Sequence, residues 1–317
     1  MKAYYSTAYG GSESSVYGDL PDPSPGVNHL LVKVKAVSIN QVDWKIRRGD
    51  LRFISGWKFP RIFGSDFAGI IRETGKEVMQ FKPGDRVYGT RSILFNRHGA
   101  LAQLRAVDQK CIRVIPDGMS FEEAAALPIA ALTALNGLRK CSVKAGSHVL
   151  INGGTGGVGH FAIQIAKARG AIVTTTCSAS NRELAISFGA DEVMGYGPAE
   201  LAATDRKFDA VMDAYGKMKL EYVCHLLKRG GTYASTLFIP PPYLSIILVR
   251  MVFGKRLTAA NMQKRPEDWK ELEKLFAEGN LKPFIENIFP LEKAADAFDL
   301  AEKGNPRGKT IVTVPED

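Results

Sequence analysis

The sequence predicts an α/β protein with two domains, one built from short strands and one from a parallel sheet covered by helices. Three observations predict it. Roughly the first 115 residues alternate between short strand patterns and turns rich in glycine and proline. From residue 147 onward, candidate strands and helices alternate along the chain. A glycine-rich turn at residues 151–159 follows the first of these later strands.

The first part of the chain is expected to be mostly β. Residues 29–37 alternate between apolar and polar side chains, which is typical of a strand with one buried face. The segment 82–85, Lys-Pro-Gly-Asp, is a turn signal because proline fixes φ and glycine permits unusual values. Such spacing favours a small β-barrel-like domain. Further short strands are expected at 69–74, 86–88 and 101–107.

The pattern changes near Pro116. Ser120 and Glu123 form a capping box, so we expect a helix to begin there, followed by another over 130–140. The later alternation predicts a parallel sheet. Its strands are expected at 147–152, 171–177, 209–213 and 231–236, with helices beginning at 158, 181 and 220. After residue 253 we expect helices over 266–278 and 291–303, then a closing strand over 309–314 that returns to the first domain.

Composition excludes several classes of protein. With 317 residues, of which 45% are hydrophobic and 24% charged, disorder, collagen and coiled coil are excluded. No apolar signal segment begins the chain, and the apolar stretch 243–253 falls short of the ~18 residues that cross a membrane. We therefore expect a cytoplasmic protein. The net charge of +9 is compatible with nucleic acid or a membrane surface, but a basic surface or attraction for an anionic cofactor is preferred.

The glycine-rich turn carries the sharpest signal. Gly154, Gly156 and Gly159 give the spacing GxGxxG between an apolar strand and an apolar helix. Dinucleotide-binding turns need a tight bend, close backbone approach to a pyrophosphate and a helix N-terminus aimed at its charge. The backbone of this turn is therefore expected to bind the cofactor, through Gly154, Thr155, Gly156, Gly157 and Val158. The alternative is a glycine-rich turn without a ligand.

The residues that follow the second predicted strand of this sheet, 171–177, determine whether NAD or NADP is bound. Enzymes that use NAD usually place an acid there to bind the ribose 2′-hydroxyl. This chain instead has Ser178, which can donate a hydrogen bond, and Arg182, which can pair with a 2′-phosphate. We therefore expect NADPH. The alternative is that Arg182 is simply a surface residue of a helix.

Six short motifs occur in one order, and this order resembles the medium-chain dehydrogenase/reductase superfamily over nearly the whole chain. Within it, the match is similar to the zinc-independent quinone oxidoreductases and enone reductases. The motifs are Asn40-x-x-Asp43, the turn at 64–69, Lys-Pro-Gly-Asp-Arg-Val at 82–87, Ala-Ala-Leu-Pro at 125–128, Leu-Thr-Ala at 132–134 and the glycine turn at 154–159.

The resemblance implies a GroES-like catalytic domain interrupted by a Rossmann domain. It implies residues 1–118 for the first part of the catalytic domain, 119–251 for the Rossmann domain and 252–317 for the completion of the catalytic domain. Zinc enzymes of this superfamily carry a cysteine ligand where this chain has Asn40 and a histidine ligand where it has Ser65. No metal site is therefore expected, because a tetrahedral zinc site needs thiolates or clustered histidines.

Without a metal, hydride can still move from a nicotinamide to a quinone or to the β-carbon of an enone, and the developing oxyanion needs stabilisation. Asn40 is expected to position the cofactor ribose or the substrate. Lys45 is the candidate cation or proton source, although relatives of this kind often have tyrosine there and a solvated lysine is an equal alternative. Asp43 is interpreted as an acceptor that holds the turn of Asn40 rather than as an acid.

The resemblance also implies further cofactor contacts, for which packing is the competing explanation. Thr133 matches a threonine near the nicotinamide, and Tyr196 a tyrosine near the 2′-phosphate. Lys309 stands where the family often has a basic residue near the cofactor. Four residues directly follow parallel strands, where ligands bind: Ala214, Tyr215, Ser235 and Phe238. The Tyr-x-x-x-Lys spacing of Tyr215 and Lys219 is interpreted as chance, because Tyr215 follows a strand rather than lying on a helix.

Two functions are compatible with these observations. The favoured one is an NADPH-dependent oxidoreductase of quinones or of the C=C bond of α,β-unsaturated aldehydes and ketones. The competitor is an NADPH-binding regulatory or interaction protein with weak catalysis, whose charge serves RNA or a membrane surface. No specific nucleic acid is expected as a partner, and at most peripheral membrane contact through 243–253. A homodimer is expected, with the same stretch at its interface or in the core.

Overall fold

The chain divides into two compact units, described separately below. A computed structural model describes residues 1–93, 96–237, 253–304 and 307–315. Unit 1 comprises Met1–Ile129 with Ile285–Asp317, and unit 2 comprises Ala130–Phe284. The domain boundaries predicted from the sequence lie after residues 118 and 251. Phe238 and most of the apolar stretch 243–253 lie outside the described residues.

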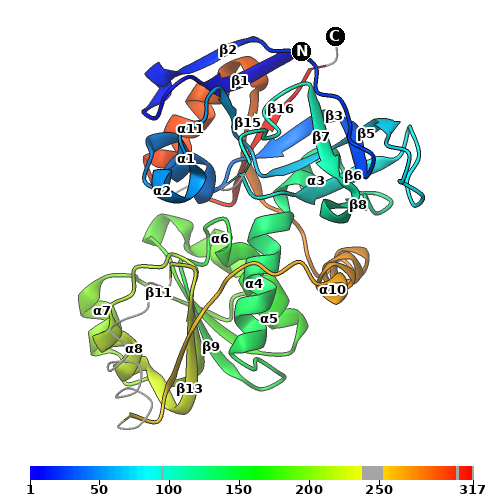
Figure 1. Cartoon of the computed structure of the whole chain (residues 1–317). Helices are drawn as coiled ribbons and strands as arrows, with labels where there is room; N and C mark the ends of the chain where they lie inside the picture. The colour runs from blue at the N-terminus through cyan, green and yellow to red at the C-terminus, as the bar shows by residue number, and fades with distance from the viewer. Residues whose placement is uncertain (94–95, 238–252, 305–306, 316–317) are drawn as a thin grey trace. The chain divides into compact units, whose positions relative to one another are not determined.

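Unit 1 consists of two sheets (Figure 1). The larger has the order β15-β16-β3-β5-β6-β8, and β7 also pairs with β3. The smaller has the order β2-β1-β4. The strands of the larger sheet are β3 (His29–Ser38), β5 (Asp66–Thr74), β6 (Arg86–Thr90), β7 (Leu104–Asp108), β8 (Ile112–Val114), β15 (Ile285–Pro290) and β16 (Lys309–Thr313). Those of the smaller are β1 (Lys2–Ser6), β2 (Ser15–Asp19) and β4 (Arg61–Ile62).

The ends of the chain meet in the larger sheet. The C-terminal strand β16 pairs antiparallel with β3, with Ile311 opposite Ser38, as expected for a strand that returns to the first domain. The backbone N–H of Ile39 continues this pairing by donating to the carbonyl of Thr310 at 3.0 Å. Strand β5 begins at Asp66, three residues before the predicted start at Gly69, so that Asp66 lies opposite Ser38 on the other side of β3. Residues near the start of β16 are therefore brought beside the end of β3.

The helices of unit 1 are short. The chain leaves β3 through Asn40 into α1, which ends where Gly49 adopts a left-handed conformation at φ 89°. Arg47 of α1 is 1% exposed and pairs with Asp299 and Glu302 of α11 at 3.2 and 2.9 Å. The helices are α1 (Gln41–Arg48), α2 (Arg52–Ser55), α3 (Phe121–Ala126) and α11 (Ala294–Glu302), with single turns η1 (Ser12–Ser14), η2 (Gln109–Cys111) and η4 (Leu291–Lys293).

Unit 2 contains a six-stranded parallel sheet in the order β11-β10-β9-β12-β13-β14. This is the doubly wound order typical of dinucleotide-binding sheets, which confirms the predicted fold class. Helix α5 packs against β9 and β10, and α8 packs against β12 and β13. The strands are β9 (His148–Asn152), β10 (Ile172–Thr176), β11 (Glu192–Met194), β12 (Phe208–Asp213), β13 (Leu227–Ser235) and β14 (Arg256–Ala259). The helices are α4 (Pro128–Lys140), α5 (Gly159–Ala168), η3 (Ala179–Asn181), α6 (Arg182–Ser187), α7 (Pro198–Ala203), α8 (Leu220–Leu226) and α10 (Pro266–Ala277).

Two interactions explain why residues 256–284 remain with unit 2. Strand β14 pairs in parallel with β13, with Leu257 opposite Tyr233. In α10, the buried carboxylate of Asp268 accepts hydrogen bonds from Asn136 and Arg139 of α4. The sequence revealed neither contact, because both depend on residues more than twenty positions apart.

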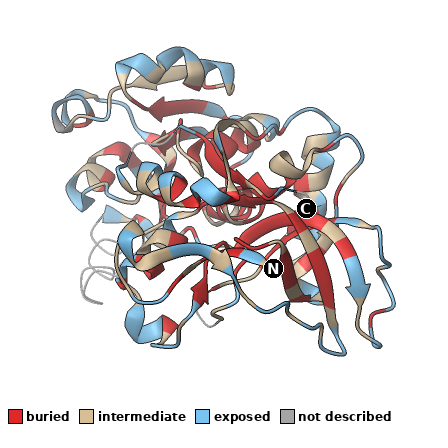
Figure 2. Cartoon of the chain, turned by 90° about the horizontal axis from the view of Figure 1, so that it is seen from above, coloured by how far each residue is buried: buried red, intermediate tan, exposed pale blue. Residues whose placement is uncertain are grey.

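Each unit has its own hydrophobic core. In unit 1 the core includes Phe67, Phe298 and Val312, and in unit 2 it includes Leu150 and Val211. Figure 2 shows the buried residues gathered in the strands, with exposed residues on the outer helices and loops. No helix among the described residues has the length and apolar character needed to cross a bilayer.

Candidate functional site

In unit 1, Asn40 is held at both ends of its side-chain amide. Its backbone is extended where β3 passes into α1. The amide nitrogen Nδ2 donates to Oδ2 of Asp66 at 3.0 Å and to the carbonyl of Ser38 at 3.3 Å. The amide oxygen Oδ1 accepts a hydrogen bond from Nζ of Lys309 at 2.7 Å. These bonds assign the orientation of the amide and leave one lone pair of Oδ1 for a further donor.

Asp43 lies fully buried beneath this residue, one turn into α1. Its Oδ2 accepts the backbone N–H of Asn40 at 2.8 Å, which is the turn-holding contact that the sequence predicts for Asp43. Its Oδ1 accepts both the N–H and the hydroxyl of Ser65 at 3.1 Å. Asp43 therefore connects the start of α1 to the turn that precedes β5.

Two carboxylates and one ammonium share this buried region. Asp66 is 0% exposed and also accepts the backbone N–H of Ile129 at 3.0 Å. The pKa of Asp43 is raised to about 7, mainly by burial and also by the neighbouring Asp66, against the donors from Asn40 and Ser65. Burial raises the pKa of Asp66 as well, and Lys309 opposes the effect. Burial lowers the pKa of Lys309, which the two carboxylates oppose. The opposite charges thus support one another where water is excluded.

Lys45 occupies a different position from the other two predicted catalytic residues. It follows Asp43 by two residues in α1, which is a rotation of about 200° around the helix axis. Its side chain is half-buried, and its ammonium lies 5.6 Å from the centroid of the Trp44 ring. The structure therefore joins Asn40 and Asp43 in one network, whereas the helix phase turns Lys45 toward another face.

Sequence reasoning did not identify two members of this network. Ser65 and Asp66 enter the sequence analysis only as part of a turn and as a position without a zinc ligand. Lys309 is predicted to lie near the cofactor, and the structure adds its hydrogen bond to Asn40. A signal was present for Asp66, because a carboxylate at the start of an otherwise apolar strand needs buried donors. Lys309 carries no such signal, since its partner is 269 residues away.

In unit 2, the three motif glycines differ in how much space surrounds them for a side chain. A Cβ on Gly154 would lie 1.9 Å from Oγ1 of Thr175, and one on Gly159 would lie 2.1 Å from the carbonyl of Gly153. A Cβ on Gly156 would meet only the carbonyl of Gly153, at 3.4 Å. Gly154 and Gly159 are thus required by the packing of helix on strand, whereas the space over Gly156 is clear. Such a clear backbone fits the approach of a pyrophosphate.

Donors are available at the same turn. The backbone N–H groups of Thr155, Gly157 and Val158 have no hydrogen-bond acceptor among the described residues. They precede the first turn of α5, where unpaired N–H groups and the helix dipole favour an anion. The turn therefore fits a dinucleotide through its backbone, as the sequence expects.

Hydrogen bonds between strand ends hold the turn in place. The side chain of Asn152 donates to Asp213 at 2.7 Å and accepts from the hydroxyl of Thr176 at 2.6 Å. The same hydroxyl accepts the N–H of Gly153 at 3.0 Å, where φ is +81°. Asp213 also accepts the N–H groups of Gly216 and Met218. The carboxyl ends of β9, β10 and β12 are thus fixed together.

The predicted 2′-phosphate residues lie beyond β10. The hydroxyls of Ser178 and Ser180 are 3.1 Å apart. Arg182 is exposed, and Nη1 donates to the carbonyl of Val193 at 3.0 Å, which leaves its other guanidinium donors for a ligand. Tyr196 is 60% exposed in the loop after β11.

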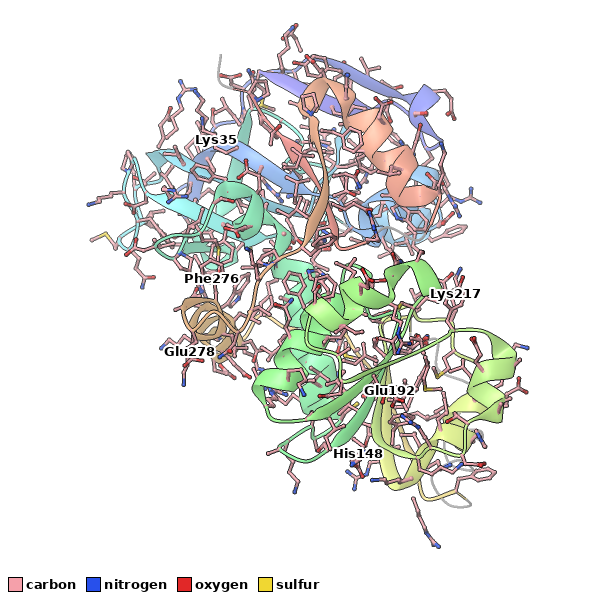
Figure 3. The ribbon with its side chains drawn as sticks, turned by 180° about the vertical axis from the view of Figure 1, so that it is seen from behind. Lys35, His148, Glu192, Lys217, Phe276 and Glu278 are labelled. Carbon is pink, nitrogen blue, oxygen red and sulfur yellow. The ribbon has the colours of Figure 1, made fainter. Side chains whose placement is uncertain are left out.

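A second cation lies on the loop after β12. Tyr215 follows β12 in a bend rather than a helix, which agrees with the interpretation of its Tyr-x-x-x-Lys spacing as chance. Its Cβ would lie 3.2 Å from a Cβ added to Gly153, so it borders the glycine turn. The ammonium of Lys217 lies 5.0 Å from the centroid of the Tyr215 ring. Figure 3 labels Lys217 on this loop.

The remaining predicted cofactor residues are less distinctive. Thr133 in α4 and Ser235 at the end of β13 are 7% and 2% exposed. Ala214 follows Asp213, and its N–H donates to the carbonyl of Asn152 at 3.0 Å. Thr133 and Ser235 are thus largely covered by protein, as the packing explanation requires.

The residues present do not fit a zinc ion. Where zinc enzymes have a thiolate and an imidazole, this chain has Asn40 and Ser65, whose side chains bond to Lys309, Asp66 and Asp43. Within the described ranges, no group of three or more His, Cys, Asp or Glu side chains is placed to hold a metal ion.

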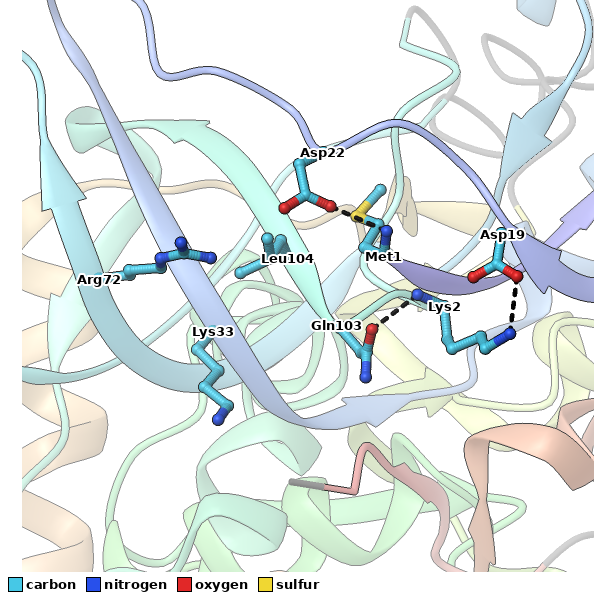
Figure 4. A pocket seen from close by; sticks show the side chains of 8 residues that line it. All are labelled: Met1, Lys2, Asp19, Asp22, Lys33, Arg72, Gln103 and Leu104. Carbon is cyan, nitrogen blue, oxygen red and sulfur yellow. Dashed lines mark hydrogen bonds and ion pairs between the residues drawn. The ribbon is translucent and has the colours of Figure 1, made fainter. Parts of the chain in front are cut away.

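A groove elsewhere in unit 1 contains none of the residues of the candidate site. Figure 4 shows its lining, in which the N-terminal amine pairs with Asp22 at 2.8 Å and Lys2 pairs with Asp19 at 2.7 Å. Lys33 and Arg72 also line it, so its cationic groups outnumber its carboxylates, and none of the predicted site residues is among them.

Comparisons with known proteins agree with this geometry. Residues 26–133 match the family model described as alcohol dehydrogenase GroES-like domain, and residues 188–312 match the one described as zinc-binding dehydrogenase. The chloroplast envelope quinone oxidoreductase homolog of Arabidopsis thaliana is 34% identical over 98% of both chains. The NADPH-dependent alkenal/one oxidoreductase, chloroplastic, of the same plant is 31% identical over 98% of this chain and 79% of its own. The solved quinone oxidoreductase from Coxiella burnetii is 32% identical, with a TM-score of 0.87 over 99% of each chain.

Substituting the two glycines separately distinguishes packing from ligand approach. Gly156→Ala is expected to weaken dinucleotide binding at least about ten-fold with an unchanged unfolding midpoint, because its methyl group meets open space. Gly154→Ala is expected to lower the unfolding midpoint, because its methyl group overlaps Thr175. Dinucleotide titration and urea unfolding of both variants check this. Unchanged binding by Gly156→Ala would contradict the assignment of the turn.

The buried carboxyl of Asp43 predicts a pH dependence of stability. Its folded pKa of about 7 exceeds the unfolded value of about 3.9, so the folded protein binds an extra proton between these values. The free energy of unfolding should fall as pH rises through this window, by up to about 1.4 kcal/mol per pH unit. Asp43→Asn should have a flatter profile in urea unfolding between about pH 4.5 and 7. Parallel profiles for the two proteins would show that Asp43 is ionised throughout.

Proposed function

Because the chain belongs to the medium-chain dehydrogenase/reductase superfamily, we propose that it is a zinc-independent, NADPH-dependent reductase of quinones or of the C=C bond of α,β-unsaturated aldehydes and ketones. The observation that carries the proposal is the glycine turn, with clear space over Gly156 and free N–H groups at the start of α5. Two relatives named for quinone and alkenal/one oxidoreduction support the choice of acceptor. The fold and these relatives support a nicotinamide cofactor.

NADPH is proposed over NADH on charge. Nicotinamide dinucleotides differ at the adenosine ribose, where NADP carries a phosphate. Downstream of β10, Ser178 offers a hydroxyl and Arg182 an exposed guanidinium, and the first acid after the strand is Glu183, on helix α6. An arginine fork matches the oxygens of a phosphate, whereas an acid would bind a free hydroxyl.

In the proposed reaction, the bound cofactor supplies a hydride to an electron-poor carbon. Asn40 accepts a hydrogen bond from a hydroxyl of the cofactor ribose or of the substrate through the free lone pair of Oδ1. Lys309 and Asp66 fix that amide, so that no rotation is needed when a ligand binds. We keep Lys45 as the proposed cation that stabilises the developing oxyanion, which requires its long side chain to extend from its own face of α1 toward the substrate beside Asn40.

The proposal predicts where a label goes. With NADPH deuterated at both C4 positions and an aryl enone, deuterium should appear at the β-carbon of the product, as read by NMR. With a quinone, NADPH should be consumed with formation of the hydroquinone. Deuterium at the carbonyl carbon would contradict C=C reduction. No turnover of any enone or quinone by protein that binds NADPH would overturn the proposed function.

The cofactor choice depends on Arg182. Arg182→Gln should raise the Kd for NADPH about ten-fold and leave the Kd for NADH unchanged, because only NADPH carries the 2′-phosphate. Fluorescence titration of both cofactors measures this. Arg169→Gln is a suitable control, because Arg169 pairs with Glu271 at 2.7 Å and follows α5 at its opposite end. Equal weakening of NADH and NADPH by Arg182→Gln would argue for a structural role of its bond to Val193.

A further inference from the structure

Unit 1 contains a group of cationic side chains around the turn that precedes β5. We call the four arginines Arg61, Arg91, Arg97 and Arg105 the basic cluster. Arg61 and Arg105 are each 2% exposed. Nη2 of Arg105 donates to the carbonyl of Arg91 at 3.4 Å. Burial lowers the pKa of the neighbouring His98, and Arg97, Arg91 and Arg105 lower it as well, so His98 is a neutral neighbour of these charges.

No carboxylate forms an ion pair with any member of the basic cluster in the part of the chain that the structure describes. Arg61 donates only to the carbonyls of Ser55 and Ile93, at 2.6 and 3.1 Å. Arg97 donates to the carbonyl of Phe59 at 3.3 Å. The buried Nε atoms of Arg61 and Arg105 have no acceptor. Burial lowers the pKa of Arg105, and Asp66 and Asp43 partly offset this effect. Arg91 and Arg97 have no ion pair among the described residues, and an anion beside their guanidinium groups would supply the missing counter-charge.

The basic cluster adjoins the Asn40 network through one residue. The carbonyl of Ser65 accepts from Nη1 of Arg105 and from the backbone N–H of Arg91, both at 3.1 Å. The N–H and hydroxyl of the same Ser65 donate to Asp43, whose other oxygen holds Asn40. The backbone of Arg91 is therefore bonded to the same residue that holds Asp43.

Apolar surface borders the basic cluster on its other side. Phe53 and Trp57 are 84% and 63% exposed, which is unusual for large aromatic side chains. The ring of Tyr9 lies 5.8 Å from that of Trp57 and 5.0 Å from that of Phe59, whose carbonyl accepts from Arg97. These contacts connect the exposed aromatic side chains to Arg97, which has no ion pair among the described residues.

We propose that the basic cluster binds an anionic group, such as a carboxylate or sulfonate, of the molecule that accepts the hydride, with the apolar body of that molecule against Phe53 and Trp57. The substrate is then an amphipathic anion rather than a neutral quinone or enone. Arg91 is the principal ligand, since its half-buried guanidinium has no partner among the described residues. This inference rests on the proposed function. The same charge could come from a phosphate of the cofactor, and the test separates the two sources.

The test compares 1,4-naphthoquinone with 1,4-naphthoquinone-2-sulfonate. The readout is the ratio of the two kcat/KM values, because intrinsic reactivity cancels when this ratio is compared between variants. Arg91→Gln should lower the ratio, sulfonate over parent, about ten-fold, and Arg91→Lys should restore part of it. Arg72→Gln, which removes an exposed arginine of β5, should leave both values unchanged. An unchanged ratio in Arg91→Gln would overturn the proposal.

Two further measurements are needed. One distinguishes an anionic substrate from a cofactor phosphate, and the other distinguishes failure of this inference from failure of the proposed function. The Kd for NADPH should be the same in wild type and Arg91→Gln, and a loss confined to NADPH would assign the basic cluster to the cofactor instead. Calorimetry with 2-naphthalenesulfonate and 2-naphthalenemethanol needs no turnover. Tighter binding of the sulfonate, lost in Arg91→Gln, supports the cluster even if neither quinone is reduced, in which case only the proposed function fails. Equal binding of both compounds overturns the inference.

Discussion

The hydrogen bond from Lys309 to Asn40 is the contact on which the organisation of unit 1 depends. A lysine that is 4% exposed needs a charged or polar partner, and this one has an amide whose other end is held by Asp66. The bond joins residues 269 apart in the sequence, so it forms only if β16 lies against β3 in the observed register. The register of β16 against β3 therefore constrains both the fold and the site, because this pairing completes the sheet and also orients the amide of Asn40.

Local patterns were sufficient for the glycine turn and the first strands of unit 2, but not for the residues from β14 to α10 or for the network around Asn40. The glycine turn, the strand before it and the helix after it lie within about twenty residues, so the sequence predicted the turn, the parallel sheet and the absence of an acid after β10. Asn40 and Asp43 were predicted together because a turn of α1 joins them. Lys309 and Asp66 come from two other strands, and only the register of β16 and β5 places them beside Asn40. Lys45 is close to Asp43 in sequence, but the helix places the two side chains on different faces, so its predicted role stays a proposal.

The glycine motif combines two constraints that a sequence pattern cannot separate. Gly154 and Gly159 are small because neighbouring backbone and Thr175 occupy the space of a side chain. Gly156 is small although the protein leaves that space empty. Gly154 and Gly159 therefore contribute to the packing that stabilises the sheet. The absence of a side chain at Gly156 is explained by the approach of a molecule outside the chain. A similar contrast exists in unit 1, where Arg47 is matched by two acids and Arg91 by none among the described residues.

The pairing of β16 with β3 also has a consequence for the order in which the protein assembles during its synthesis. Unit 2 is one continuous stretch, residues 130–284, and every strand of its sheet has left the ribosome before the last part of unit 1 is made. Residues 36–38 of β3 stay unpaired on one side until residues 311–313 emerge, and Asn40 lacks its lysine until then. In a nascent chain, the strands of the dinucleotide-binding sheet are therefore all present before the network around Asn40 can be completed. The open edge of β3 is exposed to incorrect pairing throughout that interval.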